Sequence, residues 1–273
     1  PLAMGLFSAS IMGGGGLGAS LSPVVAKASG SWHAGLALWA VPAALACAGW
    51  LALQRRACRP DDAATAPAST PASAPAPPVA MWRKRRAWAL GLHFGLVNGG
   101  YTTLVAWLPA YYQQRGASVA HSGSLLAAMT VFQAAAALLL PLAAAPFRDR
   151  RPWLVAGLAA QLTGIVGLLA YPDDAPLVWV AIAGAGLGGT FSLTLVTALD
   201  HADDHRVAGR LVAFMQGVGF IVAAMSPVVA GNLRDLTGSF SAAWIMLASC
   251  VSAMIALTFA FSPRSYGRWL SSR

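Results

Sequence analysis

Three polar side chains lie close together on one face of an otherwise apolar segment at residues 87–112. Asn98, Tyr101 and Thr102 fall within an arc of about 100° if this segment is an α-helix. Polar groups at membrane depth are costly unless they meet a partner or a water-filled cavity. Two interpretations stay open: hydrogen bonds that hold helices together, and contacts to a bound small molecule, which we predict for all three residues.

Four further side chains in apolar segments are candidates for a function. Gln133 and Gln216 are lone amides, for which we predict contacts to the same small molecule, with interhelical hydrogen bonding as the alternative. His93 is a candidate for proton coupling, and a packed neutral imidazole is the alternative. Trp107 lies near the end of its segment, where a gate and an aromatic interface belt are the two interpretations.

Several other chemistries are disfavoured by the motifs of the chain. No Ser/His/Asp elbow, HExxH sequence or P-loop occurs, and the three cysteines form no CxxC pair. In DHADDH, at residues 200–205, His201 and His205 would share a helical face. Solvated charges are ordinary at a membrane boundary, so we favour a charge-rich helix end over a metal site there. We therefore predict no enzyme, no cofactor and no bound metal.

The composition indicates a membrane protein. Of the 273 residues 57% are hydrophobic and 10% are charged, whereas a soluble domain carries about 25% charged residues. A transmembrane helix needs about 20 mostly apolar residues. We predict an all-α, polytopic fold in the lipid bilayer with eight such helices, at residues 3–26, 35–53, 87–112, 123–145, 152–171, 176–199, 208–231 and 241–261.

The distribution of Lys and Arg predicts the orientation. Fifteen of the 18 basic side chains fall in the loops of one side, and Lys27, Arg115 and Arg234 fall on the other. The positive-inside rule then places both ends of the chain in the cytoplasm. We expect the membrane to be the inner membrane of a bacterium. Because the basic residues lie between apolar runs, we read them as topology signals and expect no nucleic-acid partner. The oligomeric state is not readable from these features.

A segment rich in Ala, Pro and Ser at about 57–80 cannot bury a core. We predict four parts: two helices at 1–53, a disordered cytoplasmic linker at 54–86, a six-helix part at 87–262 and a cytoplasmic tail at 263–273.

An internal repeat relates the first and seventh predicted helices. IMGGGGLGASLSPVVA (Ile11–Ala26) aligns with MQGVGFIVAAMSPVVA (Met215–Ala230), and Gly30-Ser31-Trp32 aligns with Gly238-Ser239-Phe240 just beyond. The two helices are six helices apart in the same orientation, which predicts a parallel repeat of six-helix units. The first two helices would then be the fifth and sixth of such a protein. Since the chain also begins at Pro1, we expect it to be part of a longer protein with four preceding helices.

Three stretches have a distinctive sequence: SASIMGGGGLGASLSP with GSWHAGLALWAVPA, FGLVNGGYTTLVAWLPAYY, and GRLVAFMQGVGFIVAAMSPVVAGNL with GSFSAAWIML. They resemble the cyanate transporter and 2-nitroimidazole transporter family of the major facilitator superfamily. PFRDRRP at residues 146–152 is similar to the superfamily's basic cytoplasmic motif between the eighth and ninth helices, but it lacks the leading glycine.

The resemblance implies a secondary transporter that moves a small solute, a cyanate-like anion or a nitroimidazole-like heterocycle, by alternating access. A non-transporting membrane sensor or inactive transporter fragment is the alternative, and an intramembrane enzyme is disfavoured. Glycines repeat at Gly91, Gly95 and Gly99 and crowd residues 184–189. Small residues of this kind serve either helix sliding or plain tight packing.

Overall fold

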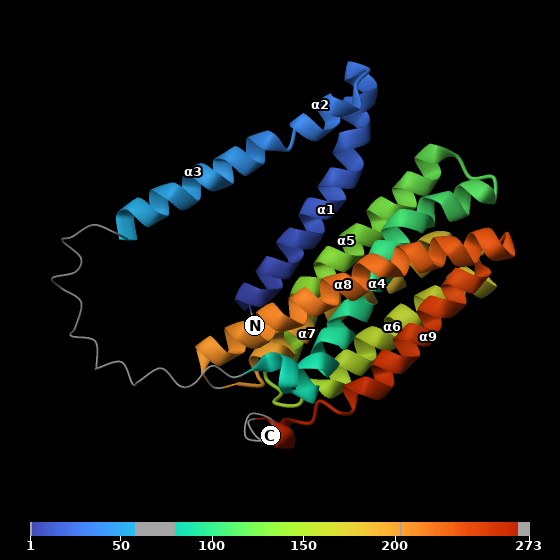
Figure 1. Ribbon diagram of the computed structural model, residues 1–273. Coiled ribbons are helices and arrows are strands. Elements are labelled where there is room, and N and C mark those ends of the chain that lie inside the picture. The colour runs from blue at the N-terminus through green and yellow to red at the C-terminus, as the bar shows by residue number, and fades with distance from the viewer. Residues whose placement is uncertain (1, 58–79, 203, 267–273) are drawn as a thin grey trace. The chain divides into compact units, whose positions relative to one another are not determined.

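The computed structural model describes residues 2–57, 80–202 and 204–266, and all regular elements in these ranges are helical (Figure 1). Residues 58–79 of the predicted linker and residues 267–273 of the predicted tail lie outside the described residues, whereas the ends of the linker, at 54–57 and 81–86, lie largely in helices. The helices are α1 (Leu2–Ser29), α2 (Trp32–Ala37), α3 (Ala40–Ala57), η2 (Met81–Arg83), α4 (Arg85–Gln114), α5 (Val119–Ala144), α6 (Arg151–Ala170), α7 (Pro176–Leu199), α8 (His205–Thr237), α9 (Ser241–Thr258) and η3 (Pro263–Ser265).

Seven helical stretches among the described residues are long and apolar enough to cross a membrane. They match seven of the eight predicted spans, and α2 and α3 count together as one stretch, Trp32–Gln54. The eighth span, α4, is not among them, although its 30 residues exceed the length that a bilayer requires. The polar face formed by Asn98, Tyr101 and Thr102 lowers the mean hydropathy of α4.

The chain divides into two compact units, which are described separately: Leu17–Pro78, and Pro1–Gly16 with Val79–Arg273. In the first unit, the helix predicted at 35–53 is interrupted at Leu38 and Trp39. Pro42 has no N–H to donate to the Leu38 carbonyl, which accepts instead from Val41 N at 3.3 Å. Trp39 Nε1 donates to Ser22 Oγ at 2.8 Å, and this bond ties the start of α3 to α1.

The predicted repeat has the same local structure in both copies. α1 and α8 each contain a proline, and each is followed by a glycine with positive φ, +68° at Gly30 and +70° at Gly238. The hydroxyl groups of Ser29 and Thr237 each donate to the carbonyl four residues earlier, at 2.7 Å, and each accepts from the backbone N–H two residues later, at 3.4 Å. The sequence similarity therefore continues into an equivalent hydrogen-bonded helix end.

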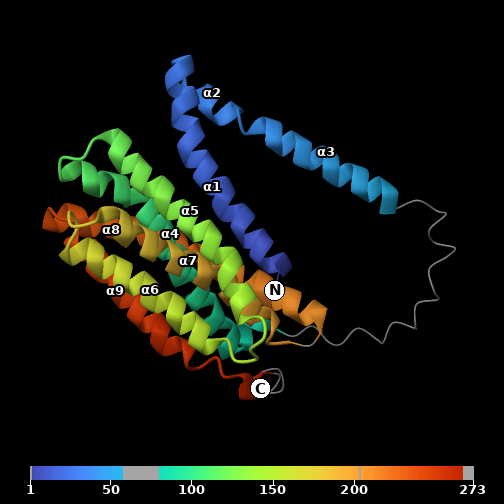
Figure 2. The same cartoon turned by 180° about the vertical axis from the view of Figure 1, so that it is seen from behind.

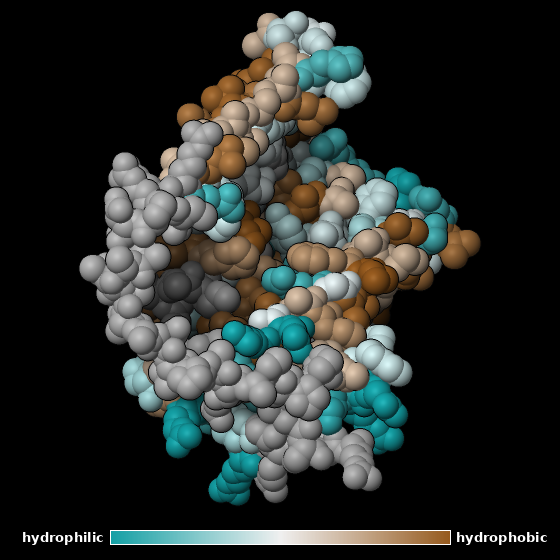
Figure 3. Space-filling model, turned by 60° about the vertical axis from the view of Figure 1, so that its left-hand side comes forward, coloured by the Kyte–Doolittle hydropathy of each residue, from teal (hydrophilic) through white to brown (hydrophobic). Residues whose placement is uncertain are grey.

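Helices α4 to α9 run alongside one another in the second unit, as Figures 1 and 2 show from opposite sides. α7 packs between α5 and α6, α4 packs along α8, and α6 packs against α9. Figure 3 shows brown and pale apolar side chains over the flank of these helices and teal hydrophilic ones mainly towards their ends. This is the distribution of a bundle whose flanks face lipid.

Glycines allow the closest helix contacts of this bundle. A Cβ at Gly188 of α7 would overlap the Gln133 carbonyl of α5, and one at Gly186 would overlap the backbone of α6 at Gln161. The repeat of glycines on α4 faces α8, where a Cβ at Gly95 would press on Val222. The glycines therefore permit tight packing here, and helix sliding, the other interpretation, stays a prediction.

The connections fall at two opposite ends of the bundle, in the alternation that the sequence predicts. At one end, Arg86 of α4 donates from Nε to His201 after α7, at 3.1 Å, and from Nη1 to the Ala260 carbonyl after α9, at 2.6 Å. At the other end, Arg115 after α4 pairs with Asp173 between α6 and α7. Loops predicted on the same side of the membrane are thus in contact.

Candidate functional site

Asn98 and Tyr101 of the α4 polar face keep hydrogen-bonding capacity that the fold does not use. The Asn98 side chain is 5% exposed, and its Nδ2 donates to the Phe94 carbonyl one turn earlier at 2.9 Å. Its Oδ1 accepts no hydrogen bond from a described residue. The partly buried Tyr101 hydroxyl likewise has no partner in this part of the chain. Both groups are available to a ligand.

Thr102 is engaged with α8 because of a proline. Pro227 lacks an N–H, so the Ala223 carbonyl one turn earlier has no helical donor. Thr102 Oγ1 donates to this carbonyl at 3.1 Å, and the neighbouring Thr103 Oγ1 is 2.8 Å from Ser226 Oγ. The predicted polar face is therefore divided between a helix–helix tie and groups that remain unpaired.

Trp107, predicted as a gate, is held against the same stretch of α8. Its Nε1 donates to the Pro227 carbonyl at 2.9 Å, and its ring fills the space over Gly231. The ring centroid is 5.8 Å from that of Phe240. In this conformation Trp107 clamps α4 to α8, and its role as a gate stays a prediction.

His93 forms a bridge between three helices. The ring is fully buried, with Nδ1 3.3 Å from Thr194 Oγ1 of α7 and Nε2 3.3 Å from Thr258 Oγ1 of α9. Both threonine hydroxyl groups already donate to carbonyls of their own helices, Thr194 to Thr190 at 2.7 Å and Thr258 to Met254 at 2.8 Å. A neutral imidazole carries one N–H, so it can donate to only one of these two oxygens. Full burial suits a packed neutral histidine, and proton coupling stays a prediction that the pH dependence of uptake by His93→Gln would test.

Two buried amides in the bundle make no hydrogen bond with any described residue. Neither the nitrogen nor the oxygen of the Gln133 side chain on α5 or of the Gln161 side chain on α6 has a partner there, and the Thr190 hydroxyl group of α7 has none either. Gln161 lies where a Cβ on Gly100 of α4 would meet its Nε2. Gln161 was not among the predicted contacts, although it is a lone amide in an apolar span, as Gln133 is. Unpaired buried amides are rare and call for a water or a ligand.

Gln216, the remaining predicted contact, differs from these groups because it is not buried. It is partly exposed on α8, and the structure gives it no hydrogen bond within the described ranges. The structure does not bring Gln216 together with the buried amides of Gln133 and Gln161, and its partial exposure does not suit a packing role. A contact between Gln216 and a small molecule stays a prediction.

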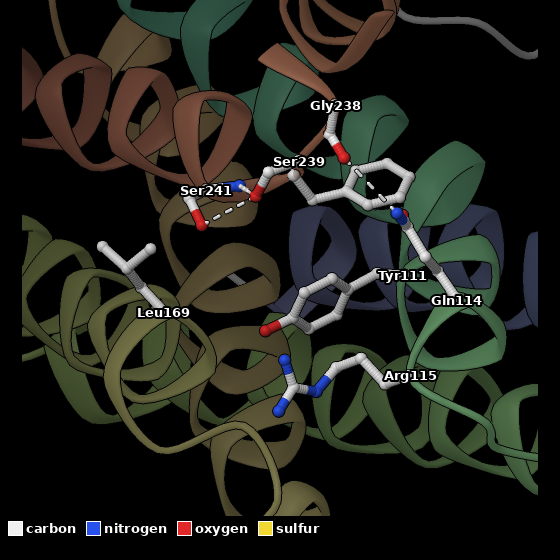
Figure 4. A pocket seen from close by; sticks show the side chains of 8 residues that line it. Tyr111, Gln114, Arg115, Leu169, Gly238, Ser239 and Ser241 are labelled. Atoms are coloured by element: carbon white, nitrogen blue, oxygen red, sulfur yellow. Dashed lines mark hydrogen bonds between the residues drawn. The ribbon is translucent and has the colours of Figure 1, made fainter.

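A pocket of about 450 Å³ opens at the end of the bundle where α4 meets the turn between α8 and α9 (Figure 4). Gln114 Nε2 donates across it to the Gly238 carbonyl at 3.4 Å. Arg115 binds both carboxylate oxygens of Asp173, which keeps the pKa of Asp173 below its ordinary value. Because this carboxylate neutralises the guanidinium, the pocket offers hydrogen bonds but little net charge.

The described residues contain no group of three His, Cys, Asp or Glu side chains that could hold a metal ion. His201 is occupied by protein contacts, since its Nδ1 lies 2.6 Å from the Thr197 carbonyl. The side chain of His205 lies outside the described residues. The structure thus offers no ligand set for a metal in this part of the chain.

Residues 1–227 match the family model of the Major Facilitator Superfamily. The chain belongs to this superfamily. It is a polytopic membrane protein, in agreement with the span pattern and the all-helical described residues.

Curated relatives include transporters of small molecules. The chain is 45% identical over 263 residues to the cyanate transport protein CynX of Escherichia coli, an alignment that covers 96% of this chain and 66% of that protein. The 2-nitroimidazole transporter of Escherichia coli is 32% identical over 59% of this chain and 41% of its own length. The uncharacterized transporter YycB of Bacillus subtilis is 25% identical over 85% of this chain and 56% of its length. The chain therefore spans about two thirds or less of the length of each of these relatives.

Proposed function

We propose that the protein is a secondary transporter that moves a small solute across the bacterial inner membrane by alternating access, and that it is not an enzyme. Its superfamily and its similarity to CynX support this function. The observation that carries a binding role for this chain is the set of unpaired polar groups inside an apolar bundle, on α4, α5 and α6. A membrane sensor without transport activity is the second candidate, which the absence of uptake despite solute binding would favour.

We place the solute contacts of this chain at Asn98 and Tyr101, and the unpaired amides of Gln133 and Gln161 are further candidates. These side chains supply hydrogen-bond donors and acceptors but no charge. Within the described helices, Lys and Arg occur only near helix ends. Such a set suits a polar heterocycle or the polar end of a small anion, so uptake of labelled cyanate and of 2-nitroimidazole, each in competition with the other, separates the two classes.

Asn98→Leu should weaken the apparent affinity for the solute about tenfold, in the natural protein that carries this chain. The substitution removes a hydrogen-bonding amide, and a loss of about 1.4 kcal/mol of binding free energy corresponds to a factor of ten. Saturable uptake into membrane vesicles measures this affinity, and thermal unfolding in detergent measures stability.

Thr102→Val is the matched control for Asn98→Leu. It removes the bond to the Ala223 carbonyl, so it should lower stability by about 0.6 kcal/mol and leave the affinity for the solute within a factor of two. If Asn98→Leu also lowered only the melting temperature, Asn98 would be a packing residue and the proposed contact would be wrong.

We also propose that the end of the bundle that carries Arg86 and the α5–α6 loop faces the cytoplasm. In a variant without native cysteines, Ser118→Cys between α4 and α5 should react with an impermeant maleimide in cells whose outer membrane is permeabilised. Ala145→Cys, after α5, should react only when the inner membrane is also opened. Both residues are exposed, so the comparison is matched. The reverse pattern of labelling would invert the orientation.

A further inference from the structure

A second pocket, of about 500 Å³, lies at the other end of the bundle from that of Figure 4. Three segments that are distant in the sequence form its walls: the α5–α6 loop, the end of α7 and the residues after α9. The lining residues are Arg148, Arg150, Leu199, Asp200, His201, Ala202, Pro263 and Tyr266. Neither the transport function nor the proposed solute contacts account for it.

The two arginines of this pocket differ in their partners. Arg150 is buried, with its Nε 3.0 Å from Asp200 Oδ2 and its Nη1 bonded to the Ala144 carbonyl. Arg148 is exposed to the pocket and makes no hydrogen bond or ion pair with any described residue. Since Asp200 already neutralises Arg150, the positive charge of Arg148 is left uncompensated.

Tyr266 adds an unused donor to the same pocket. Its hydroxyl group is shielded from solvent and has no hydrogen-bond partner in the described part of the chain. Burial raises the pKa of Tyr266 to about 12, so the hydroxyl group keeps its proton at neutral pH. A buried donor without an acceptor is unfavourable, and either a water or a ligand can supply the acceptor.

His201 also lines the pocket, as a neutral ring held by two hydrogen bonds. Arg86 can only donate, so His201 Nε2 accepts from it, and His201 Nδ1–H donates to the Thr197 carbonyl. Burial, together with the charge of Arg86, lowers the pKa of His201 to about 4, which keeps the ring neutral. The ring packs against that of Tyr266, with centroids 4.1 Å apart and the ring planes tilted by 37°.

We propose that this pocket binds a phosphate-class oxyanion, held by the free guanidinium of Arg148 and the hydroxyl group of Tyr266. A guanidinium presents paired N–H groups that match phosphate oxygens, and charge-assisted bonds of this kind are strong. The pocket is larger than a phosphate ion needs, so it also admits a substituent on the phosphate. Two sources share this chemistry: a soluble phosphate compound and the headgroup of an anionic phospholipid. The site does not depend on which solute is transported.

Titration calorimetry with inorganic phosphate tests the soluble source, with the natural protein in neutral detergent at low ionic strength. Arg148→Gln should weaken binding about tenfold, and Tyr266→Phe about fivefold, because they remove a charged and a neutral hydrogen bond respectively. Arg148→Lys should retain part of the affinity, since it keeps the charge but loses the paired donors. Because Arg148 has no partner in the protein, Arg148→Gln should leave the melting temperature unchanged.

Arg210→Gln is the matched control. Arg210 is also exposed and unpaired among the described residues, but it does not line the pocket. The Arg210→Gln variant should bind phosphate with an affinity within a factor of two of that of the unsubstituted protein.

Nanodiscs test the lipid source. Native mass spectrometry should show phosphatidylglycerol retained from mixed bilayers in preference to phosphatidylcholine, and less of it in Arg148→Gln. Binding of phosphate that depends on Arg148 and Tyr266 supports the proposal and identifies a soluble source. Retention of phosphatidylglycerol alone, with the same dependence, supports the proposal and identifies the lipid source. Binding of neither ligand, or an equal loss in Arg210→Gln, overturns it. Transport of the solute is not measured, so these outcomes are independent of the proposed function.

Discussion

Gly188→Leu should lower the free energy of unfolding by about 3 kcal/mol or more and reduce the yield of folded protein. Gly188 lies where α7 packs against the backbone of α5, and even a Cβ there would overlap the Gln133 carbonyl. A backbone atom cannot move aside as the end of a flexible side chain can. The two helices would therefore have to separate, and contacts along their length would be lost. Denaturant titration of the purified protein, followed by tryptophan fluorescence, measures the effect.

Gly217→Leu provides the control at another glycine in the middle of a helix. A Cβ on Gly217 of α8 would meet nothing within 4 Å. The free energy of unfolding of this variant should therefore change by no more than about 0.5 kcal/mol. Equal losses at the two positions would show that glycine itself, rather than the α5–α7 contact, determines the result.

Asp200→Asn should lower the free energy of unfolding by about 3 kcal/mol. The Arg150 side chain is 10% exposed, and Asp200 is its only carboxylate partner in the described ranges. Removing that charge leaves a guanidinium buried without compensation, which costs more than the lost attraction alone. Because the Asp200 side chain is 34% exposed, we expect the lower end of the range known for buried pairs. The same denaturant titration measures this loss.

Asp235→Asn is the comparison for an exposed pair. Arg234 and Asp235 are 42% and 68% exposed, so solvent replaces their interaction when it is removed. We expect a loss of at most about 1 kcal/mol. If Asp200→Asn were as mild as Asp235→Asn, the pair of Arg150 and Asp200 would have no special role in joining the α5–α6 loop to α7.

The sequence by itself determined the features that depend on distance along the chain. A bilayer requires a minimum apolar length, so the spans can be read from composition, and the alternation of basic loops predicts which loops share an end. The repeat was also readable, because the residues of Ile11–Ala26 align with those of Met215–Ala230. The structure adds that a glycine with positive φ follows both α1 and α8. The break before α3 was missed because Pro42 lacks the N–H that would bond to the Leu38 carbonyl, and hydropathy does not register this loss.

Only the tertiary structure decided which polar groups are paired. Asn98 and Thr102 look alike on a helical face, yet Thr102 meets a carbonyl that Pro227 leaves free on α8, whereas the Asn98 oxygen meets no donor. Likewise, residue types alone do not distinguish Arg150, which pairs with Asp200, from the free Arg148. The physical reason is that a hydrogen-bond partner depends on the rotation and register of one helix against another. Hydropathy, which is a property of each segment alone, does not contain that information.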